Sequence, residues 1–208
     1  MTTLCIPYEK ENLKKSDQKK IRCAKCDGCY EIKDGKYGAF GGCSNFPKCK
    51  STLNFHQLIH DFFRENGYRI YRWERECWKC SRQTDIYSYY LLYELAQSYP
   101  FFDSFSGIGL SDLPSLDNYL CELLENISSS YSRTVNDHYV ANHCQYCGAL
   151  QGYNYVVEDP HEIFGDLIIK KNMDKYLFTT IPFQAIETSL SEIKDCFVEL
   201  RTFFIPEE

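Results

Sequence analysis

Four cysteines near the N-terminus have the spacing of metal ligands. Cys23 and Cys26 are separated by two residues, and sixteen residues later Cys43 and Cys49 are separated by five. Zn²⁺ takes four ligands in a tetrahedron, and thiolates on two tight turns reach it from opposite sides. Residues 36–42 alternate aromatic side chains with glycine, which is typical of a short hairpin strand whose backbone passes close to a metal. The sequence therefore predicts a zinc site here.

A second set of four cysteines is divided between two distant pairs. Cys77 and Cys80 form the first pair, and Cys144 and Cys147 form the second, 63 residues later. Each pair has the two-residue gap of a metal-binding turn and follows a predicted strand, so we expect the pairs to share a second zinc ion across a long insertion. Two closed four-thiolate sites leave no open position for a substrate, so both ions are expected to be structural.

Two residues next to these sets leave alternatives open. Cys29 is a fifth thiol close to the first site, where it either competes as a ligand or is idle. His143 precedes Cys144 and could replace a thiolate, although a neighbour of this kind more often supports the ligands or lies on the surface.

Residues 23–52 carry a more specific signature. It consists of Cys23, Cys26, Gly28, Tyr37, Gly38, Phe40, Gly42, Cys43, Ser44, Pro47, Cys49 and the following Lys50-Ser51-Thr52. These residues resemble the C-terminal zinc fingers of bacterial type IA DNA topoisomerases, which implies a zinc ribbon that grips single-stranded DNA. Asp27 and Cys29 depart from that pattern, and the catalytic topoisomerase core is not visible. The remainder of the chain, around the second cysteine set, resembles a poorly described bacterial zinc module, and this second resemblance implies no function.

The predicted ribbon also carries the groups that contact unpaired nucleic acid. Aromatic side chains stack on bases and lysines meet phosphates. Alternatively, the aromatic side chains pack the ribbon's own small core, which we favour for Phe40. The candidate contact residues are Lys25, Lys33, Lys36, Tyr37, Phe46, Lys48 and Lys50.

Charge is divided unevenly along the 208 residues. Residues 1–83 contain 17 lysines and arginines against 10 acidic residues, whereas residues 84–208 contain 6 against 19. The basic half is suited to a polyanion and the acidic half is not. Four thiolates and one Zn²⁺ sum to −2, so residues 1–55, formally +5, carry about +3 when metallated.

Composition predicts a folded protein, with 44% hydrophobic and 16% aromatic residues, and the mixture of expected helices and strands indicates the α+β class. We expect a basic arm and zinc ribbon over residues 1–55, then an α+β domain with a split ribbon over 56–208. The sequence shows no apolar run that could span a membrane and no secretory leader, so twelve cysteines favour metal binding in a reducing cytoplasm.

The remaining elements follow from apolar periodicity. We expect the insertion to begin with a strand and to include one clear helix, and the tail to end in a helix capped by Thr188 or Ser189. The expected helices span 56–66, 115–127 and 188–204, and the expected strands span 68–74, 84–95, 138–143 and 153–158.

No catalytic motif is evident, since the sequence lacks a glycine-rich phosphate loop, a Gly-x-Ser-x-Gly turn and a deaminase signature. The sequence therefore predicts a non-catalytic zinc protein that binds single-stranded nucleic acid, DNA more than RNA, through the N-terminal ribbon. The alternative is a protein-interaction adaptor in which zinc is purely structural and the acidic half binds a protein partner.

Overall fold

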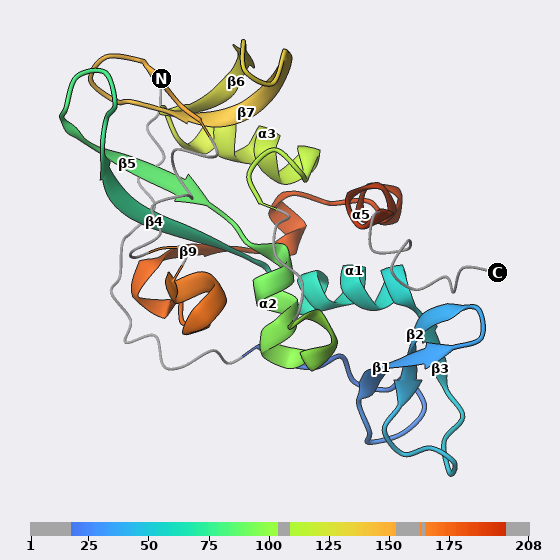
Figure 1. Ribbon diagram of the computed structural model, residues 1–208. Coiled ribbons are helices and arrows are strands. Elements are labelled where there is room, and N and C mark those ends of the chain that lie inside the picture. The colour runs from blue at the N-terminus through green and yellow to red at the C-terminus, as the bar shows by residue number, and fades with distance from the viewer. Residues whose placement is uncertain (1–17, 104–108, 153–162, 164, 199–208) are drawn as a thin grey trace.

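The computed structural model describes residues 18–103, 109–152, 163 and 165–198. Three small antiparallel sheets and several short helices confirm the α+β class (Figure 1). The sheets have the strand orders β1-β2-β3, β5-β4-β9 and β6-β7-β8. The strands are β1 (Tyr30–Gly35), β2 (Gly38–Cys43), β3 (Thr52–Asn54), β4 (Tyr68–Glu76), β5 (Gln83–Ser88), β6 (Ile127–Ser132), β7 (Asp137–His143), β8 (Leu150–Gln151) and β9 (Leu177–Ile181).

The helices are short and none of those described is long and apolar enough to cross a membrane. The α-helices are α1 (Phe55–Asn66), α2 (Leu91–Ser98), α3 (Pro114–Leu123) and α5 (Leu190–Cys196). Single turns of 3₁₀ or π-helix are η1 (Pro100–Phe102), η2 (Gly165–Ile169), η3 (Asp174–Tyr176) and η4 (Phe183–Ala185).

The β1-β2-β3 sheet is the expected ribbon and leads directly into α1. Asn54, the last residue of β3, caps the helix because its side chain accepts a hydrogen bond from the His56 amide. Gly41 lets α1 lie close to β2, since a Cβ at this position would be 3.3 Å from the Leu58 side chain. Ribbon residues such as Tyr30 belong to the same apolar core as α1. The proposed domain boundary at residue 55 stays a prediction.

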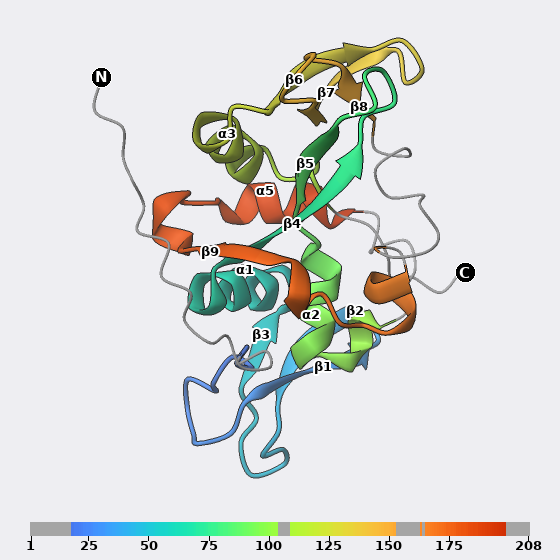
Figure 2. The same ribbon diagram turned by 90° about the vertical axis from the view of Figure 1, so that its left-hand side faces the viewer.

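The predicted helix over 56–66 is confirmed. Its apolar stripe is fully buried, and Gly67 follows with φ of 70° while its amide bonds the Phe63 carbonyl. The stripe consists of Leu58, Ile59, Phe62 and Phe63. In both views α1 lies between the ribbon and the β5-β4-β9 sheet (Figures 1 and 2). Helix α5 packs on α1 and buries Ile193, and Phe197, which follows the helix, is also buried, so this part of the tail docks on the core.

Strand β4 is buried on both faces. Tyr68 and Ile70 join the main core with α1, whereas Tyr71 and Trp73 join a second apolar cluster with α2 and η2. Arg72 is exposed and pairs with Asp85 at 2.8 Å.

Two predictions for the insertion were wrong. Residues 84–95 are not one strand, because the chain leaves β5 at Ser88 and forms α2, whose leucines at helical spacing enter the core. The helix expected over 115–127 ends at Leu123, and Ile127 begins β6. Residues 128–130 are all serines, which disfavour a helix, and their backbone hydrogen bonds are made instead by pairing of β6 with β7.

The C-terminal helix, expected over 188–204, begins two residues later than expected, at Leu190, and part of the expected range lies outside the described residues. Ser189 is the N-cap, and its hydroxyl accepts a hydrogen bond from the Glu192 amide at 3.1 Å. Helix α5 ends at Cys196, and 199–204 lie outside the described residues, as does the strand expected over 153–158.

Candidate metal centres and nucleic-acid interface

The first four cysteines converge as the spacing predicted. Their four sulfur atoms lie within 4.8 Å of one another. The Cys23 and Cys49 sulfurs are 3.8 Å apart, and those of Cys26 and Cys43 are 3.4 Å apart. A zinc tetrahedron with bonds of about 2.3 Å has edges of about 3.8 Å, whereas a disulfide would bring two sulfurs to about 2 Å. The cluster therefore fits one Zn²⁺ and excludes these disulfides.

Backbone amides in the metal-binding turns point at the sulfurs. The amides of Lys25 and Gly28 each lie 3.4 Å from a sulfur, those of Cys23 and Cys26 respectively. The hydrogen bond from Lys25 lowers the pKa of the Cys23 thiol to about 6, against the opposing effect of burial. The Asn45 amide has the same effect on Cys43, but burial and the neighbouring thiols outweigh it and raise the pKa of that thiol to about 12, so a cation is needed to deprotonate the full set.

The second four cysteines also converge, although the two pairs are distant in sequence. All four sulfurs lie within 4.8 Å, and both Cys77–Cys147 and Cys80–Cys144 distances are 3.7 Å. Burial raises the pKa of the Cys77 thiol, but hydrogen bonds from the Cys80 and Lys79 amides outweigh it and bring the pKa to about 6. These distances match the edges of a second zinc tetrahedron.

The two turns of the second cluster are geometrically equivalent. The Cys77 amide bonds the Arg82 carbonyl and the Cys144 amide bonds the Ala149 carbonyl, each at 2.9 Å. Ser81 and Gly148 occupy matching positions and both have positive φ, 57° and 66°. The turns lie at the ends of β4 and β7, so a metal would join two sheets that share no strand.

The described geometry does not support Cys29 or His143 as a metal ligand. The metal-capable groups found among the described residues contain neither Cys29 nor His143. His143 instead contacts Ser130, with Nε2 2.8 Å from the hydroxyl oxygen, and burial lowers its pKa. Cys121 and Cys196 also lie outside both clusters, and burial raises the pKa of each.

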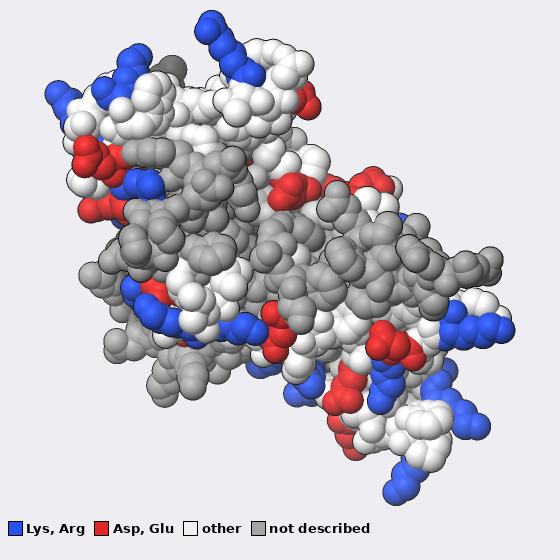
Figure 3. All heavy atoms as spheres, viewed as in Figure 1, with Lys and Arg blue, Asp and Glu red and all other residues white. Residues whose placement is uncertain are grey.

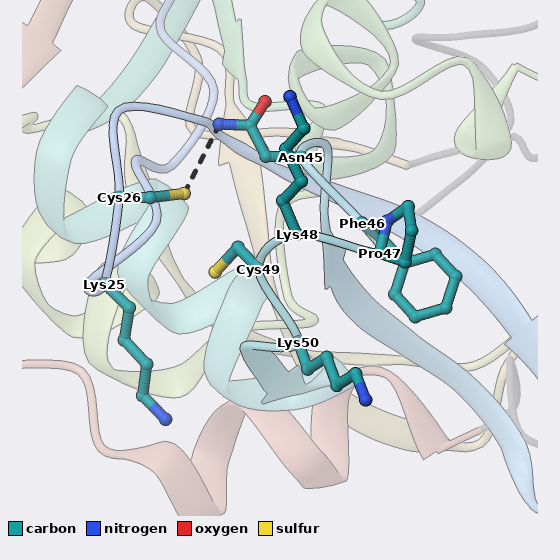
Figure 4. A pocket seen from close by; sticks show the side chains of 8 residues that line it. All are labelled: Lys25, Cys26, Asn45, Phe46, Pro47, Lys48, Cys49 and Lys50. Atoms are coloured by element: carbon teal, nitrogen blue, oxygen red, sulfur yellow. Dashed lines mark hydrogen bonds between the residues drawn. The ribbon is translucent and has the colours of Figure 1, made fainter.

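A shallow, open hollow of about 710 Å³ lies over the first metal-binding turns (Figure 4). Four of the seven predicted contact residues line it, namely Lys25, Phe46, Lys48 and Lys50. The Phe46 ring is 66% exposed, so it is free of the ribbon core. The sequence missed one further residue here, Asn45, whose amide nitrogen lies 3.5 Å from the Cys26 sulfur.

The other three candidates lie on the β1-β2 hairpin, away from this hollow. Tyr37, at the tip, is 94% exposed, and the Lys36 ammonium lies 5.4 Å from its ring centre. Lys33 is exposed and its aliphatic stem lies against Gly42. Phe40, by contrast, is half-buried against Gly35, as the packing alternative for that residue predicted.

The five candidate lysines are available to a ligand. All are exposed, and among the described residues none forms an ion pair with a carboxylate. Lysine and arginine side chains project from the ribbon end in Figure 3. The ribbon end is therefore a basic surface with two exposed aromatic rings.

A comparison with known proteins supports the ribbon. The chain is 52% identical over 53 residues to DNA topoisomerase 1 of Methanocaldococcus jannaschii. The match covers 24% of this chain and 7% of that protein, so the shared part is a short segment. The bacterial type IA class stays a prediction. No family model and no solved structure matches the chain.

Proposed function

We propose that the chain is a non-catalytic zinc protein whose N-terminal ribbon binds single-stranded nucleic acid, with DNA preferred. The observation that carries this proposal is the hollow over the first cysteine cluster, where an exposed ring lies among three lysines that form no ion pair with any carboxylate in the described part of the chain. The similarity to a segment of a DNA topoisomerase favours DNA, and the type IA signature of residues 23–52 favours a single strand.

The chemistry of the hollow suits a sequence-tolerant ligand. The face of Phe46 can stack on any base, at about 1–3 kcal/mol per stacked base, because every base has a π-face. Lys25, Lys48 and Lys50 can follow the backbone phosphates on either side of the ring. Both metal-binding turns contribute to the hollow, so zinc would fix the ring and the ammonium groups relative to each other.

Zinc supplies no chemistry to a ligand in this scheme. Four thiolates fill a tetrahedral shell, and a closed shell has no position for a water or a substrate. The ion would instead determine the fold of the ribbon, since a structural site contributes about 10–16 kcal/mol of apparent binding free energy.

The test is fluorescence anisotropy of a labelled oligothymidylate titrated with the zinc-loaded chain at several salt concentrations. Three phosphate contacts predict that the logarithm of the association constant falls against the logarithm of salt with a slope of about −2. Substitution of Lys25, Lys48 and Lys50 by Ala should abolish that slope. Phe46→Ala should weaken binding at least about fivefold, and Phe46→Tyr should restore it.

The matched control replaces three exposed cations elsewhere, namely Arg133, Lys170 and Lys194, by Ala. Lys175 still pairs with Asp166 in this control, so the local structure around Asp166 keeps a cation. Equal losses in the control and in the hollow variant would contradict a specific surface. No binding at low salt, with two zinc ions present per chain, would contradict the function itself.

The adaptor alternative depends on an acidic surface in the second half, and several of its acidic residues are not on the surface. Glu94, Asp117 and Asp166 are each at most 3% exposed. Tyr89 donates a hydrogen bond to Asp117, and Lys170 and Lys175 pair with Asp166. The acidic count therefore overstates the charge that a protein partner would meet.

A further inference from the structure

The second cysteine cluster carries its own pair of exposed aromatic rings. Trp78, which follows the buried Cys77, is 58% exposed, and Tyr146, which precedes the half-buried Cys147, is 53% exposed. Among the described aromatic side chains, four are more than half exposed, and all four lie on the two zinc-binding elements. The other two are Tyr37 and Phe46 on the first ribbon. Outside the two zinc-binding elements the most exposed described aromatic ring is Tyr131, at 49%, so the exposed rings concentrate at the cysteine clusters, where they are available for a ligand.

Both rings of the second cluster are held in place. The Trp78 indole nitrogen donates a 2.7 Å hydrogen bond to the Leu150 carbonyl, which joins the two metal-binding turns. The Arg82 guanidinium lies over the Tyr146 ring, 5.2 Å from its centre. A rigid ring loses little conformational entropy on binding, and a planar guanidinium stacks on bases as aromatic rings do.

The turns that carry Trp78 and Tyr146 are not acidic, unlike the second half of the chain. Residues 77–83 contain Lys79 and Arg82 and no acidic residue, and residues 144–152 contain no charged residue. Lys79 and Arg82 are both exposed. A metallated four-thiolate site adds about −2, and Glu76 adjoins the turn, so the local net charge is small. Stacking, more than phosphate pairing, would dominate binding here.

We propose that this surface, formed by Trp78, Lys79, Arg82 and Tyr146, is a second contact for single-stranded nucleic acid. The inference rests on the proposed function of the first ribbon and extends it to the whole molecule. The two clusters lie at opposite ends of the molecule in both views (Figures 1 and 2). A long strand could therefore engage both surfaces and gain affinity from the linkage, whereas a short strand could engage only one at a time.

Intrinsic fluorescence tests this surface separately from the ribbon. The chain has two tryptophans, and Trp73 is 7% exposed, so a ligand that quenches by stacking reaches Trp78 alone. Oligothymidylate added to the zinc-loaded full chain should quench part of the tryptophan emission. Trp78→Phe should abolish the quenching and keep two zinc ions per chain. The quenching should persist at salt concentrations that release the strand from the lysines of the ribbon.

Variants separate the two surfaces. Tyr146→Ala should weaken binding of a long oligothymidylate at least about fivefold, Tyr146→Phe should restore it, and a short strand held by the ribbon should change little.

The outcomes distinguish the two proposals. Salt-sensitive anisotropy without Trp78 quenching would contradict nucleic-acid binding at the second surface and leave the ribbon's function intact. A protein would then be the ligand of the exposed rings. Quenching that survives replacement of Lys25, Lys48 and Lys50 by Ala would support the second surface even if those lysines proved dispensable. No quenching by strands of any length would overturn it.

Discussion

The two cysteine clusters have the same ligands and similar sulfur separations, but they hold different kinds of structure. In the first, all four cysteines lie within residues 23–49, and the cluster organises a local sheet. In the second, the paired turns are 63 residues apart and the cluster joins two separate sheets. The loop between the second pairs is about four times longer, so its closure costs about 1.2 kcal/mol more entropy than that of the first.

The comparison separates two roles for one chemistry. The first cluster supplements a small core, because its short ribbon contributes few fully buried side chains, such as Ile21 and Tyr30, to the apolar core that it shares with α1. The second cluster reinforces a fold that already has a core, since β4 buries Tyr68, Ile70, Tyr71 and Trp73 without any metal. Metal loss should therefore affect the two regions differently.

Removal of zinc by a strong chelator should have the largest effect. The amides of residues 30–54 should lose all hydrogen-exchange protection, because about 10–16 kcal/mol of apparent binding energy per site disappears. The amides of β4 from Tyr68 to Trp73 should stay protected from exchange. The amides of the turns at 77–83 and 144–151 should lose their protection. Exchange followed by mass spectrometry measures both, and uniform loss across the chain would break the distinction between the regions.

Single ligand substitutions sharpen the comparison. Cys23→Ser should leave one zinc ion per chain and abolish the salt-dependent part of the binding of a short oligothymidylate, which the ribbon lysines supply. Cys77→Ser should also leave one ion and lower the free energy of unfolding by several kcal/mol, but keep that binding. Metal analysis, urea unfolding and anisotropy give the three readouts. Loss of short-strand binding in Cys77→Ser would show that the two regions are not independent.

The pH dependence of stability distinguishes the zinc regions from the core between them. Burial raises the pKa of Glu94 to about 8, so between about pH 5 and pH 8 the folded state keeps a proton that the unfolded state has lost. This group therefore makes stability fall as pH rises through that range, whereas acid weakens the zinc regions by protonating thiolates.

Glu94→Gln cannot ionise, so it should flatten the alkaline decline, but it also removes the carboxylate 3.8 Å from the Arg69 guanidinium, so the readout is the slope of stability against pH. Urea unfolding at pH 6 and pH 8 measures the change. An equal decline in both proteins would show that the carboxyl group is not its source.

The contact between ribbon and helix gives the smallest predicted effect. Gly41→Val places a side chain 3.3 Å from those of Leu53 and Leu58 and should lower the free energy of unfolding by about 1–3 kcal/mol. Thr52→Val at an exposed position of β3 is the control and should change it by less than about 0.5 kcal/mol. No difference between the two in urea unfolding would mean that the ribbon does not pack on α1.

The sequence was most informative where short-range chemistry decides the structure. Both cysteine groupings, α1 with its Gly67 terminus, and the Ser189 cap follow from spacing and local capping. The second half of 84–95 and the end of the helix at Leu123 depend on packing against distant elements, and no local pattern indicates that packing.

The candidate site was predictable in its residue types but not in its arrangement. Spacing identified the lysines and rings, but only the fold shows that Lys25, Phe46, Lys48 and Lys50 share one hollow while Lys36 and Tyr37 lie at a hairpin tip. Trp78 and Tyr146 were missed as surface residues, because an aromatic residue between two cysteines gives no indication of its exposure.

The most direct test of the ribbon's function is a ¹⁵N NMR titration of the zinc-loaded full chain with a short oligothymidylate. The account predicts that the largest amide shift changes fall on residues 25–26 and 45–50, which line the hollow, with smaller changes at the hairpin tip. Shift changes confined to the acidic second half, or none at low salt, would contradict it.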